Sequence, residues 1–215
     1  MREKIDQLIS HVQSSLYLLN EACNEIWHIT QTPNTKEEYD IVSGHPFSFY
    51  GVALQYCFIM EYAKLLDSNS SKEDENVASL YRLNNCVNEF LGEEYQTKYL
   101  ENKKLLNEIS KSELCIRLKK LRNKKFGHAD NDSINNPLKI EGFTGEQIVQ
   151  IKDQLRLILK IANNSIIAAT KASFMLNDDS RTANFIRYHA KYKQYYFKNF
   201  IKAAEEGYGL HREVE

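Results

Sequence analysis

The sequence predicts an all-α fold, an antiparallel bundle of about five to seven helices. Apolar residues recur at three- and four-residue steps along most of the chain, as they do on the buried faces of amphipathic helices. The 215 residues include only 3 prolines and 8 glycines, so helix-breaking residues are few. No strand-like alternation of useful length and no internal repeat interrupts this pattern.

The first half of the chain predicts three helices and one short turn. Residues 3–29 place their aliphatic side chains on one face of a long helix, and the segment 35–38 forms a capping box that opens a short turn. Residues 47–66 are apolar almost all round, so we expect neighbours on several sides, or a partner chain, to pack against this helix. Residues 77–91 form the third helix, which stops at Gly92.

The second half of the chain predicts four further helices. Residues 93–109 are polar and give the least regular pattern of the four. A capping box at 110–113 opens the next helix, which ends at Gly127. A second capping box, at 144–147, opens the longest regular helix, whose apolar residues recur near a heptad. The last helix covers 181–206 and carries aromatic and basic residues together.

We expect residues 1–215 to form a single domain, with 1–30 as its N-terminal helix and 178–206 as an extension. The 4 cysteines lack the paired spacing of zinc or redox sites and indicate buried thiols in a reducing compartment. The sequence has no signal-peptide pattern, no membrane-spanning stretch, and no nucleotide-binding or zinc-hydrolase motif. We therefore expect a cytoplasmic protein with no membrane association, no metal and no cofactor.

One basic stretch stands out as a candidate site. The formal net charge is −1, so affinity for nucleic acid must come from local clusters. Within 117–125, six of nine residues are basic, and no acid follows before Asp130. On an uninterrupted helix Arg122 and His128 would not share a face. Gly127 is the residue type that ends a helix in a left-handed turn, which would let His128 swing back towards Arg122.

The run 122–128 (Arg-Asn-Lys-Lys-Phe-Gly-His) resembles the signature of the HEPN superfamily (higher eukaryotes and prokaryotes nucleotide-binding). In that signature an arginine, most often followed by Asn, Asp or His, precedes a histidine by a few residues. Asp130 is similar to the residue at this place in the abortive-infection AbiU-type branch. The stretch 47–67, followed by Ser-Leu at 79–80, also looks like that branch, so the resemblance touches roughly half of the chain.

The resemblance implies an HEPN-like bundle and a metal-independent endoribonuclease of a toxin or anti-phage defence system. It also implies a homodimer in which each subunit contributes half of the site that acts on RNA. Arg122 would orient and neutralise the phosphate, His128 would act as general acid or base, and Asn123 would hold the local geometry. The RNA backbone would be attracted by four lysines: Lys119, Lys120, Lys124 and Lys125.

The role of Asp130 is open, because it would either orient His128 or cap the chain after the helix. Some HEPN toxins carry at this position a tyrosine that a partner nucleotidyltransferase modifies. Its replacement by Asp130 argues against that type of antitoxin, while another neutralising antitoxin or partner protein still fits the resemblance.

Other interpretations compete with this one. Basic residues and histidine at a helix end also favour the negative end of the helix dipole without any catalytic role. The chain would then be a non-catalytic HEPN module that binds RNA, a nucleotide or a protein as scaffold or sensor, or a helical interaction protein that dimerises through 47–66. The tyrosines of the last helix would either stack on single-stranded RNA or, as we expect, pack on the bundle.

Overall fold

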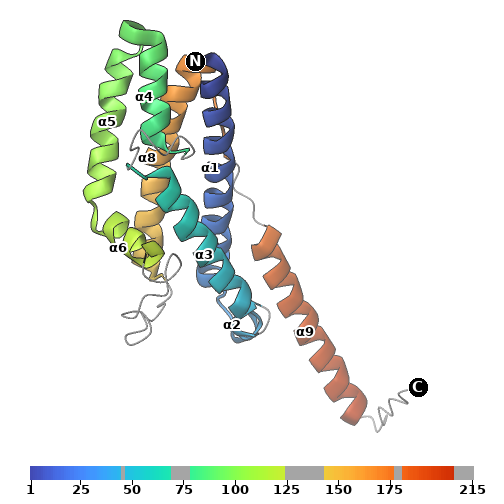
Figure 1. Cartoon of the computed structure of the whole chain (residues 1–215). Coiled ribbons are helices and arrows are strands. Elements are labelled where there is room, and N and C mark those ends of the chain that lie inside the picture. Colours follow the sequence, from blue (N-terminus) through green and yellow to red (C-terminus); the bar gives the residue numbers. More distant parts are fainter. Residues whose placement is uncertain (45–46, 69–77, 124–142, 177–180, 206–215) are drawn as a thin grey trace. The chain divides into compact units, whose positions relative to one another are not determined.

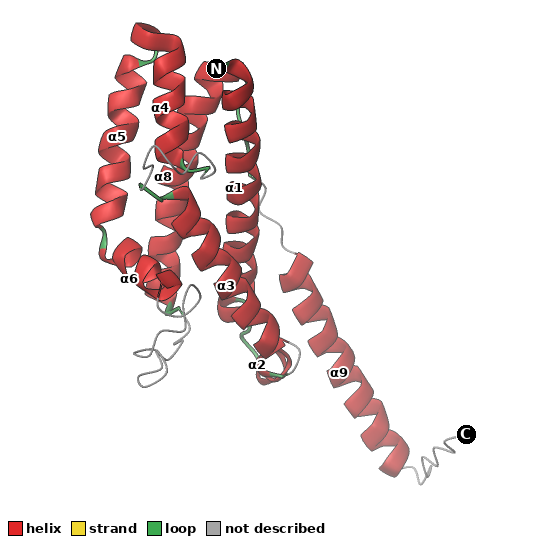
Figure 2. Ribbon diagram, viewed as in Figure 1, coloured by secondary structure: helices red, strands yellow, loops and turns green. Residues whose placement is uncertain are grey.

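The computed structural model describes residues 1–44, 47–68, 78–123, 143–176 and 181–205 (Figure 1). These residues contain no strand, and Figure 2 shows among them only helices (red) and loops (green), which confirms the all-α prediction. The described elements are α1 (Arg2–Gln31), α2 (Lys36–Ser43), α3 (Phe47–Leu65), α4 (Leu80–Leu91), η1 (Gly92–Glu94), α5 (Gln96–Lys111), α6 (Glu113–Leu121), α8 (Gly145–Thr170) and α9 (Arg181–Glu205). The short turn expected after Thr35 is a helix of 8 residues, α2.

The chain divides into two compact units. Unit 1 contains Met1–Asn24 and Ala53–Asp178, and unit 2 contains Glu25–Val52 and Asp179–Glu215. The division falls inside α1 and α3, so each of these helices contributes residues to both units. The basic stretch of α6 belongs to unit 1, and the aromatic and basic helix α9 belongs to unit 2.

Unit 1 is an antiparallel bundle built around α8, which packs against α4, α5 and α6. The Arg2 guanidinium at the start of α1 donates to the Ala169 carbonyl at the end of α8 (2.5 Å), and the two helices run in opposite directions (Figure 1). The face of α1 that the sequence predicts to be apolar is buried, because Ile5, Val12 and Leu16 are inaccessible to solvent. Burial of such side chains is the main stabilising contribution to a bundle of this kind.

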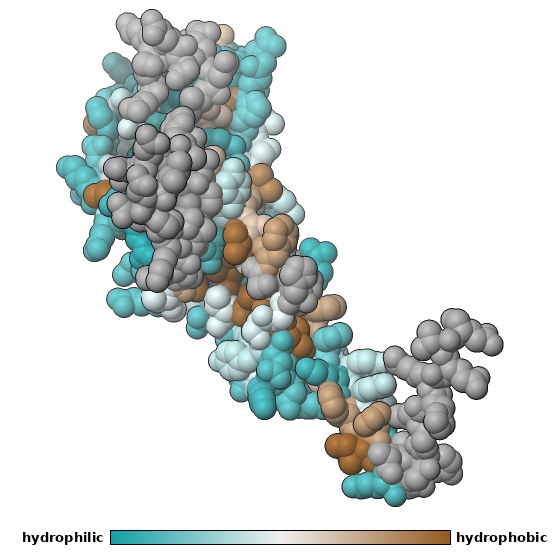
Figure 3. Space-filling model, turned by 60° about the horizontal axis from the view of Figure 1, so that its bottom comes forward, coloured by the Kyte–Doolittle hydropathy of each residue, from teal (hydrophilic) through white to brown (hydrophobic). Residues whose placement is uncertain are grey.

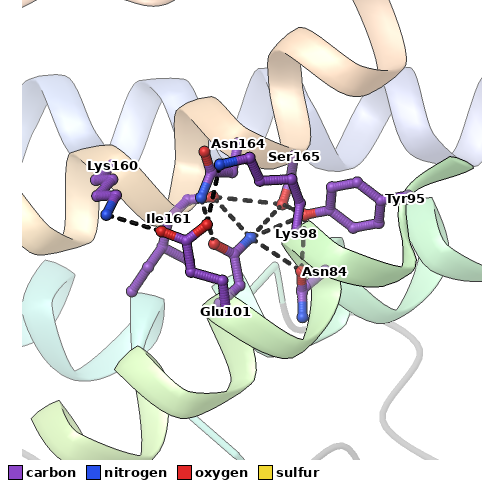
Figure 4. A network of polar contacts seen from close by, with 9 residues as sticks. Asn84, Tyr95, Lys98, Glu101, Lys160, Ile161, Asn164 and Ser165 are labelled. Carbon is purple, nitrogen blue, oxygen red and sulfur yellow. Dashed lines mark hydrogen bonds and ion pairs between the residues drawn. The ribbon is translucent and has the colours of Figure 1, made fainter.

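The polar segment after Gly92 forms a complete helix, α5, because its one buried side-chain amide, that of Asn102, has partners on α4, on α8 and at Tyr95, which are labelled in Figure 4. The Asn102 amide nitrogen lies 2.8 Å from the Tyr95 hydroxyl and 3.0 Å from the Asn84 amide oxygen on α4. It also lies 3.3 Å from the Ser165 hydroxyl on α8. Burial raises the pKa of Tyr95 to about 12, so its hydroxyl stays protonated and donates to Asn84 (2.8 Å). The network joins α4, α5 and α8 and compensates for the weak apolar pattern of α5.

Of the three predicted capping boxes, the one at 144–147 forms in full, the one at 35–38 forms only the bond to the Thr35 hydroxyl because the Glu38 carboxylate accepts from the Asn34 amide, and the third is wrong. Thr144 opens α8 with both bonds of a capping box, and Thr35 caps α2 by accepting from the Glu38 amide (3.2 Å). The box expected at 110–113 does not form, because Ser110 lies inside α5 and donates to the Asn107 carbonyl (3.0 Å). Ser112 is the cap of α6 instead, as the next subsection describes.

The apolar helix predicted at 47–66 is α3, and burial changes along its length. Its C-terminal half is in the core of unit 1, where Phe58, Tyr62 and Leu65 are inaccessible to solvent. Its N-terminal half exposes large side chains, including Phe49 and Val52. The expectation of neighbours on several sides therefore holds for the second half only. Neither α3 nor any other described helix is long and apolar enough to cross a membrane.

None of the four cysteines forms a disulfide. Cys23, Cys86 and Cys115 are buried as predicted, whereas Cys57 on α3 is half-buried. Burial raises the pKa of the thiols of Cys57, Cys86 and Cys115 above the ordinary value, so all three are protonated at neutral pH. These thiols contribute to packing and are poor nucleophiles.

In unit 2, α9 packs on α2. Three residues on one face, Ala183, Ile186 and Ala190, are buried. The Thr182 hydroxyl donates to the Glu25 carboxylate on α1 (2.6 Å), and the Phe185 ring lies 6.2 Å from the Phe47 ring on α3. The expectation that the tyrosines of this helix pack on the bundle is wrong, since all four are exposed: Tyr188, Tyr192, Tyr195 and Tyr196.

Candidate nucleic-acid interface at the end of α6

The start of α6 is fixed by hydrogen bonds to other elements of unit 1. The Ser112 hydroxyl accepts from the Cys115 amide (3.2 Å) and donates to the Ile109 carbonyl at the end of α5 (2.7 Å). It also accepts from the Gln154 side-chain amide on α8 (2.8 Å), whose oxygen accepts from the Tyr62 hydroxyl on α3. Ser112 rather than Ser110 is thus the helix start because it alone reaches α8.

The body of α6 buries one side and presents its cations on the others. Leu114, Cys115 and Leu118 are buried, while Lys120 is exposed and Lys119 is half-buried. The regular helix ends at Leu121, and Arg122 and Asn123 continue in a π-helical turn. Cations near a helix C-terminus are favoured by the partial negative charge of its last carbonyls. The helix therefore holds a cluster of positive charge with little electrostatic cost.

The Arg122 guanidinium is held by two side chains. Its Nε donates to the Asn123 amide oxygen (2.9 Å), and its Nη1 lies 3.4 Å from a carboxylate oxygen of Asp67, which follows α3. The Arg122 side chain is 28% exposed and that of Asp67 is 23% exposed. Because the guanidinium is planar and has five N–H donors, these two contacts orient it and leave donor capacity for an anion such as phosphate.

The structure brings together only part of the predicted site. Arg122 and Asn123 are in direct contact, and Lys119 and Lys120 lie on the preceding turn of α6. The other four predicted residues lie outside the described part of the chain: Lys124, Lys125, His128 and Asp130. The convergence of Arg122 with His128, and the end of the helix at Gly127, therefore stay predictions.

Asp67 is the residue of this site that the sequence reasoning missed. It lies at the end of the apolar stretch 47–67 that carries part of the HEPN resemblance, as the first carboxylate after the last apolar turn of α3. The sequence alone shows that an acidic residue stands at that position. Its pairing with Arg122, 55 residues further along the chain, is a tertiary contact that no local pattern reveals.

The ionisable groups beneath the site do not supply acid–base chemistry. Burial raises the pKa of the Tyr62 phenol far above its usual range, and the neighbouring Cys115 raises it further. Burial likewise raises the pKa of the Cys115 thiol. Both groups stay protonated near neutral pH, so their role is to pack and to hold the start of α6. The described residues contain no cluster of His, Cys, Asp and Glu that would hold a metal ion.

A comparison with models of protein families shows which family the chain belongs to. The model of the AbiU2 family (HEPN_AbiU2) matches residues 2–187. The chain belongs to this family of HEPN proteins. It is thus a module related to abortive infection, and the resemblance based on the run 122–128 is confirmed. Comparisons with curated proteins and with solved structures gave no match.

The AbiU2 match includes the whole of the basic stretch and Asp67. It extends from α1 to Arg187, near the start of α9. Residues 188–205, which form the remainder of α9, lie beyond the matched range.

Proposed function

We propose that this AbiU2-family chain is a metal-independent endoribonuclease of a toxin or anti-phage defence system. The observation that carries the proposal is the Arg122 guanidinium, which two side chains orient at the partly exposed end of a basic helix. The family membership supports the same conclusion, because the matched range includes Arg122 and the run 122–128 that resembles the HEPN signature. A fixed cation stabilises the negative charge that develops on a phosphate in the transition state, and this effect can accelerate a reaction greatly.

Each side chain has a role in RNA cleavage. His128, acting as base, removes the proton of the ribose 2′-hydroxyl, whose oxygen then bonds to phosphorus. The bond from phosphorus to the 5′ oxygen of the next nucleotide breaks, and that oxygen takes up a proton from a general acid. Arg122 binds the non-bridging oxygens as their negative charge grows, and Asn123 keeps the guanidinium in place. The products are a 2′,3′-cyclic phosphate and a 5′-hydroxyl end.

The proposed site is shared by two copies of the chain. One histidine and one arginine from each protomer meet at a single phosphodiester, so that the histidine of one copy acts as base and that of the other as acid. The flanking cations Lys119, Lys120, Lys124 and Lys125 attract the RNA backbone to this place. A homodimer is therefore part of the proposal, and dilution below its dissociation constant should abolish cleavage.

The test is cleavage of total RNA and of tRNA in the presence of EDTA. We expect the wild-type chain to cut, and Arg122→Ala and His128→Ala to lose at least about 100-fold in rate, in line with the loss of one oxyanion donor or of a general base. Arg156→Ala and His11→Ala are matched controls, because Arg156 pairs with Asp153 on the exposed side of α8 and His11 is exposed on α1. Equal cleavage by all variants, or none by the wild type, would refute the proposal.

The Asp67 contact favours a second candidate, a non-catalytic HEPN module that binds RNA, a nucleotide or a protein. A carboxylate 3.4 Å from the Arg122 guanidinium neutralises part of the charge that a scissile phosphate would need. Under this alternative, His128→Ala leaves binding and biological protection intact. Reversal of charge at Lys124 and Lys125 then weakens RNA binding if RNA is the ligand.

A further inference from the structure

The outer face of α9 carries a row of exposed tyrosines. Tyr188, Tyr192 and Tyr195 are 71%, 63% and 66% exposed. Their spacing of four and three residues places them on one face of the helix, about 180° from the face of Ala183, Ile186 and Ala190 that is buried. Large aromatic side chains directly opposite the packed face of a helix have no role in holding that helix to its neighbours.

The three rings differ in this respect from other aromatic side chains of unit 2. Phe185 lies 6.2 Å from the Phe47 ring and is stacked on His189 at 5.6 Å. By contrast, none of the three tyrosines makes a ring contact or a hydrogen bond with another residue in the described part of the chain. Packing within unit 2 therefore does not explain them, and we name the three together the tyrosine row.

Basic side chains run beside the tyrosine row. Arg187, Lys191, Lys198 and Lys202 are exposed and fall on one side of it, with Lys191 and Lys202 nearest. No acidic residue occurs in α9 before Glu205. Figure 3 shows apolar (brown) and hydrophilic (teal) side chains next to each other at the surface along the C-terminal part of α9; tyrosine, which is weakly hydrophilic on this scale, is drawn pale there. The face thus places aromatic rings that make no ring contact or hydrogen bond in the described part of the chain beside four cations of α9, two of which, Lys198 and Lys202, also line a pocket with Glu37 and Asp40 of α2.

We propose that this face of α9 binds single-stranded RNA, with one base on each ring of the tyrosine row and the phosphates along the adjacent cations. The rise of a helix separates the rings by about 6 Å and about 4.5 Å along its axis. Both steps exceed the rise of about 3.4 Å between stacked bases in a duplex strand, so the strand must be unstacked to place a base on each ring. Base–aromatic stacking and backbone neutralisation are the two means by which proteins hold single strands.

The charge of the face favours single-stranded RNA over two other binding partners, a second copy of the chain and a membrane surface. A second copy of the chain would bring two basic faces together, which opposes association. A membrane surface would suit a helix whose apolar face lies opposite its basic face, whereas here the basic stripe adjoins the aromatic one. The inference rests on the proposed function only in naming RNA instead of DNA as the strand. It adds a substrate-holding surface in unit 2, beyond the residues that the AbiU2 family match covers.

The first experiment measures binding of a labelled 12-nucleotide single-stranded RNA by fluorescence anisotropy, with the full chain carrying His128→Ala so that the RNA stays intact. Replacing all three tyrosines of the row by leucine should weaken binding about 100-fold, and each single replacement about 5-fold or more. Tyr17→Leu is the matched control, because Tyr17 is 55% exposed on α1 and lies outside α9. Its affinity should equal that of the parent chain.

Two further measurements separate stacking from charge. Tyr192→Phe keeps the aromatic ring and should bind RNA with the affinity of the parent chain, whereas Tyr192→Gln removes the ring and should bind more weakly. These two single variants test the stacking even if the triple variant does not fold. Combined Lys191→Gln, Lys198→Gln and Lys202→Gln should lower the slope of log affinity against log salt by about 2, since each contact to a single strand contributes about 0.7. Lys104→Gln on α5, an exposed lysine near Glu108, should leave the slope unchanged.

Several outcomes would overturn the inference. Equal affinity of the parent and the triple leucine variant would do so, as would equal binding of duplex and single-stranded RNA with the same dependence on the tyrosines. Tighter binding to anionic lipid vesicles than to RNA would assign the face to membranes. Loss of a dimer in the triple variant, with unchanged RNA affinity, would assign it to a second copy. Single-stranded DNA bound more tightly than RNA would refute the choice of strand.

The same variants distinguish failure here from failure of the proposed function. If His128→Ala cuts RNA like the wild type while the tyrosine variants lose binding, the catalytic proposal fails and the role of α9 stands. If cleavage requires Arg122 and His128 but the triple leucine variant binds and cuts normally, the role of α9 fails alone.

Discussion

Asp67→Asn is expected to tighten RNA binding about 1.5- to 5-fold. The substitution keeps an oxygen that accepts from Arg122 and removes the negative charge that competes with phosphate. The Arg122 Nη1 to Asp67 Oδ2 distance is 3.4 Å, and the two side chains are 28% and 23% exposed, so solvent screens the pair. Pairs of this kind contribute about 0.2–1 kcal/mol, which sets the range given for the affinity.

The assay is anisotropy with single-stranded RNA in the His128→Ala background, together with urea unfolding. Asp67→Asn should lower the free energy of unfolding by less than about 1 kcal/mol without changing the m-value. Asp153→Asn is the matched control, because Asp153 forms a similar pair with Arg156 on the exposed side of α8 (2.7 Å) and should leave RNA affinity unchanged. If Asp67→Asn weakens binding as much as Arg122→Ala does, the carboxylate positions the guanidinium and does not compete with RNA.

Three further predictions concern the elements that hold the site. Asn102→Leu should lower the free energy of unfolding, measured in urea, by about 2–4 kcal/mol, since it removes a hydrogen-bond partner from two buried acceptors, the Asn84 amide oxygen and the Ile161 carbonyl. Asn107→Ala on the exposed side of α5 should cost under about 0.5 kcal/mol. Gln154→Leu should cost about 1–3 kcal/mol and slow RNA cleavage, because it releases the start of α6; the exposed Gln150→Leu should do neither. Stability should fall as pH rises above about 9, because burial raises the pKa of the Cys115 thiol above its ordinary value of 9.0, so that unfolding releases its proton. Calorimetry should show that the Cys115→Ala variant releases about one proton fewer on unfolding above this pH, so that its free energy of unfolding depends less steeply on pH. An unchanged slope would contradict the attribution to Cys115.

The sequence predicted the helices best where the pattern is local. The face of α1 and the capping box of α8 depend on residues within one or two turns of each other, and both formed as expected. The polar helix α5 was the weakest prediction because the partners of Asn102 lie on α4 and α8, at Asn84 and Ser165. A network between distant segments leaves no periodic signal in any one of them.

The same distinction separates the predicted part of the site from the rest. Arg122 and Asn123 are adjacent in the sequence, and the motif identified them directly. The sequence did not identify Asp67, because only a tertiary contact brings it to Arg122. It predicted Ser110 instead of Ser112 as the N-cap of α6, because the capping motif takes no account of the hydrogen bond between Ser112 and Gln154. For α9, sequence reasoning expected aromatic residues to be buried. The helix has more aromatic residues than one packed face can cover, so the remainder are exposed.

The position of Arg122 depends on contacts at both ends of α6. This helix has 9 residues, too few to be stable alone, so its orientation comes from the groups that hold it. Ser112 ties its start to α8, and Asp67 meets the guanidinium at its end from the segment after α3. Since α3 also supplies the Tyr62 hydroxyl to Gln154, one helix contributes to both attachments. A shift of α3 would therefore move the whole of α6, so substitutions in the core of α3 should alter RNA cleavage without touching any residue that meets RNA.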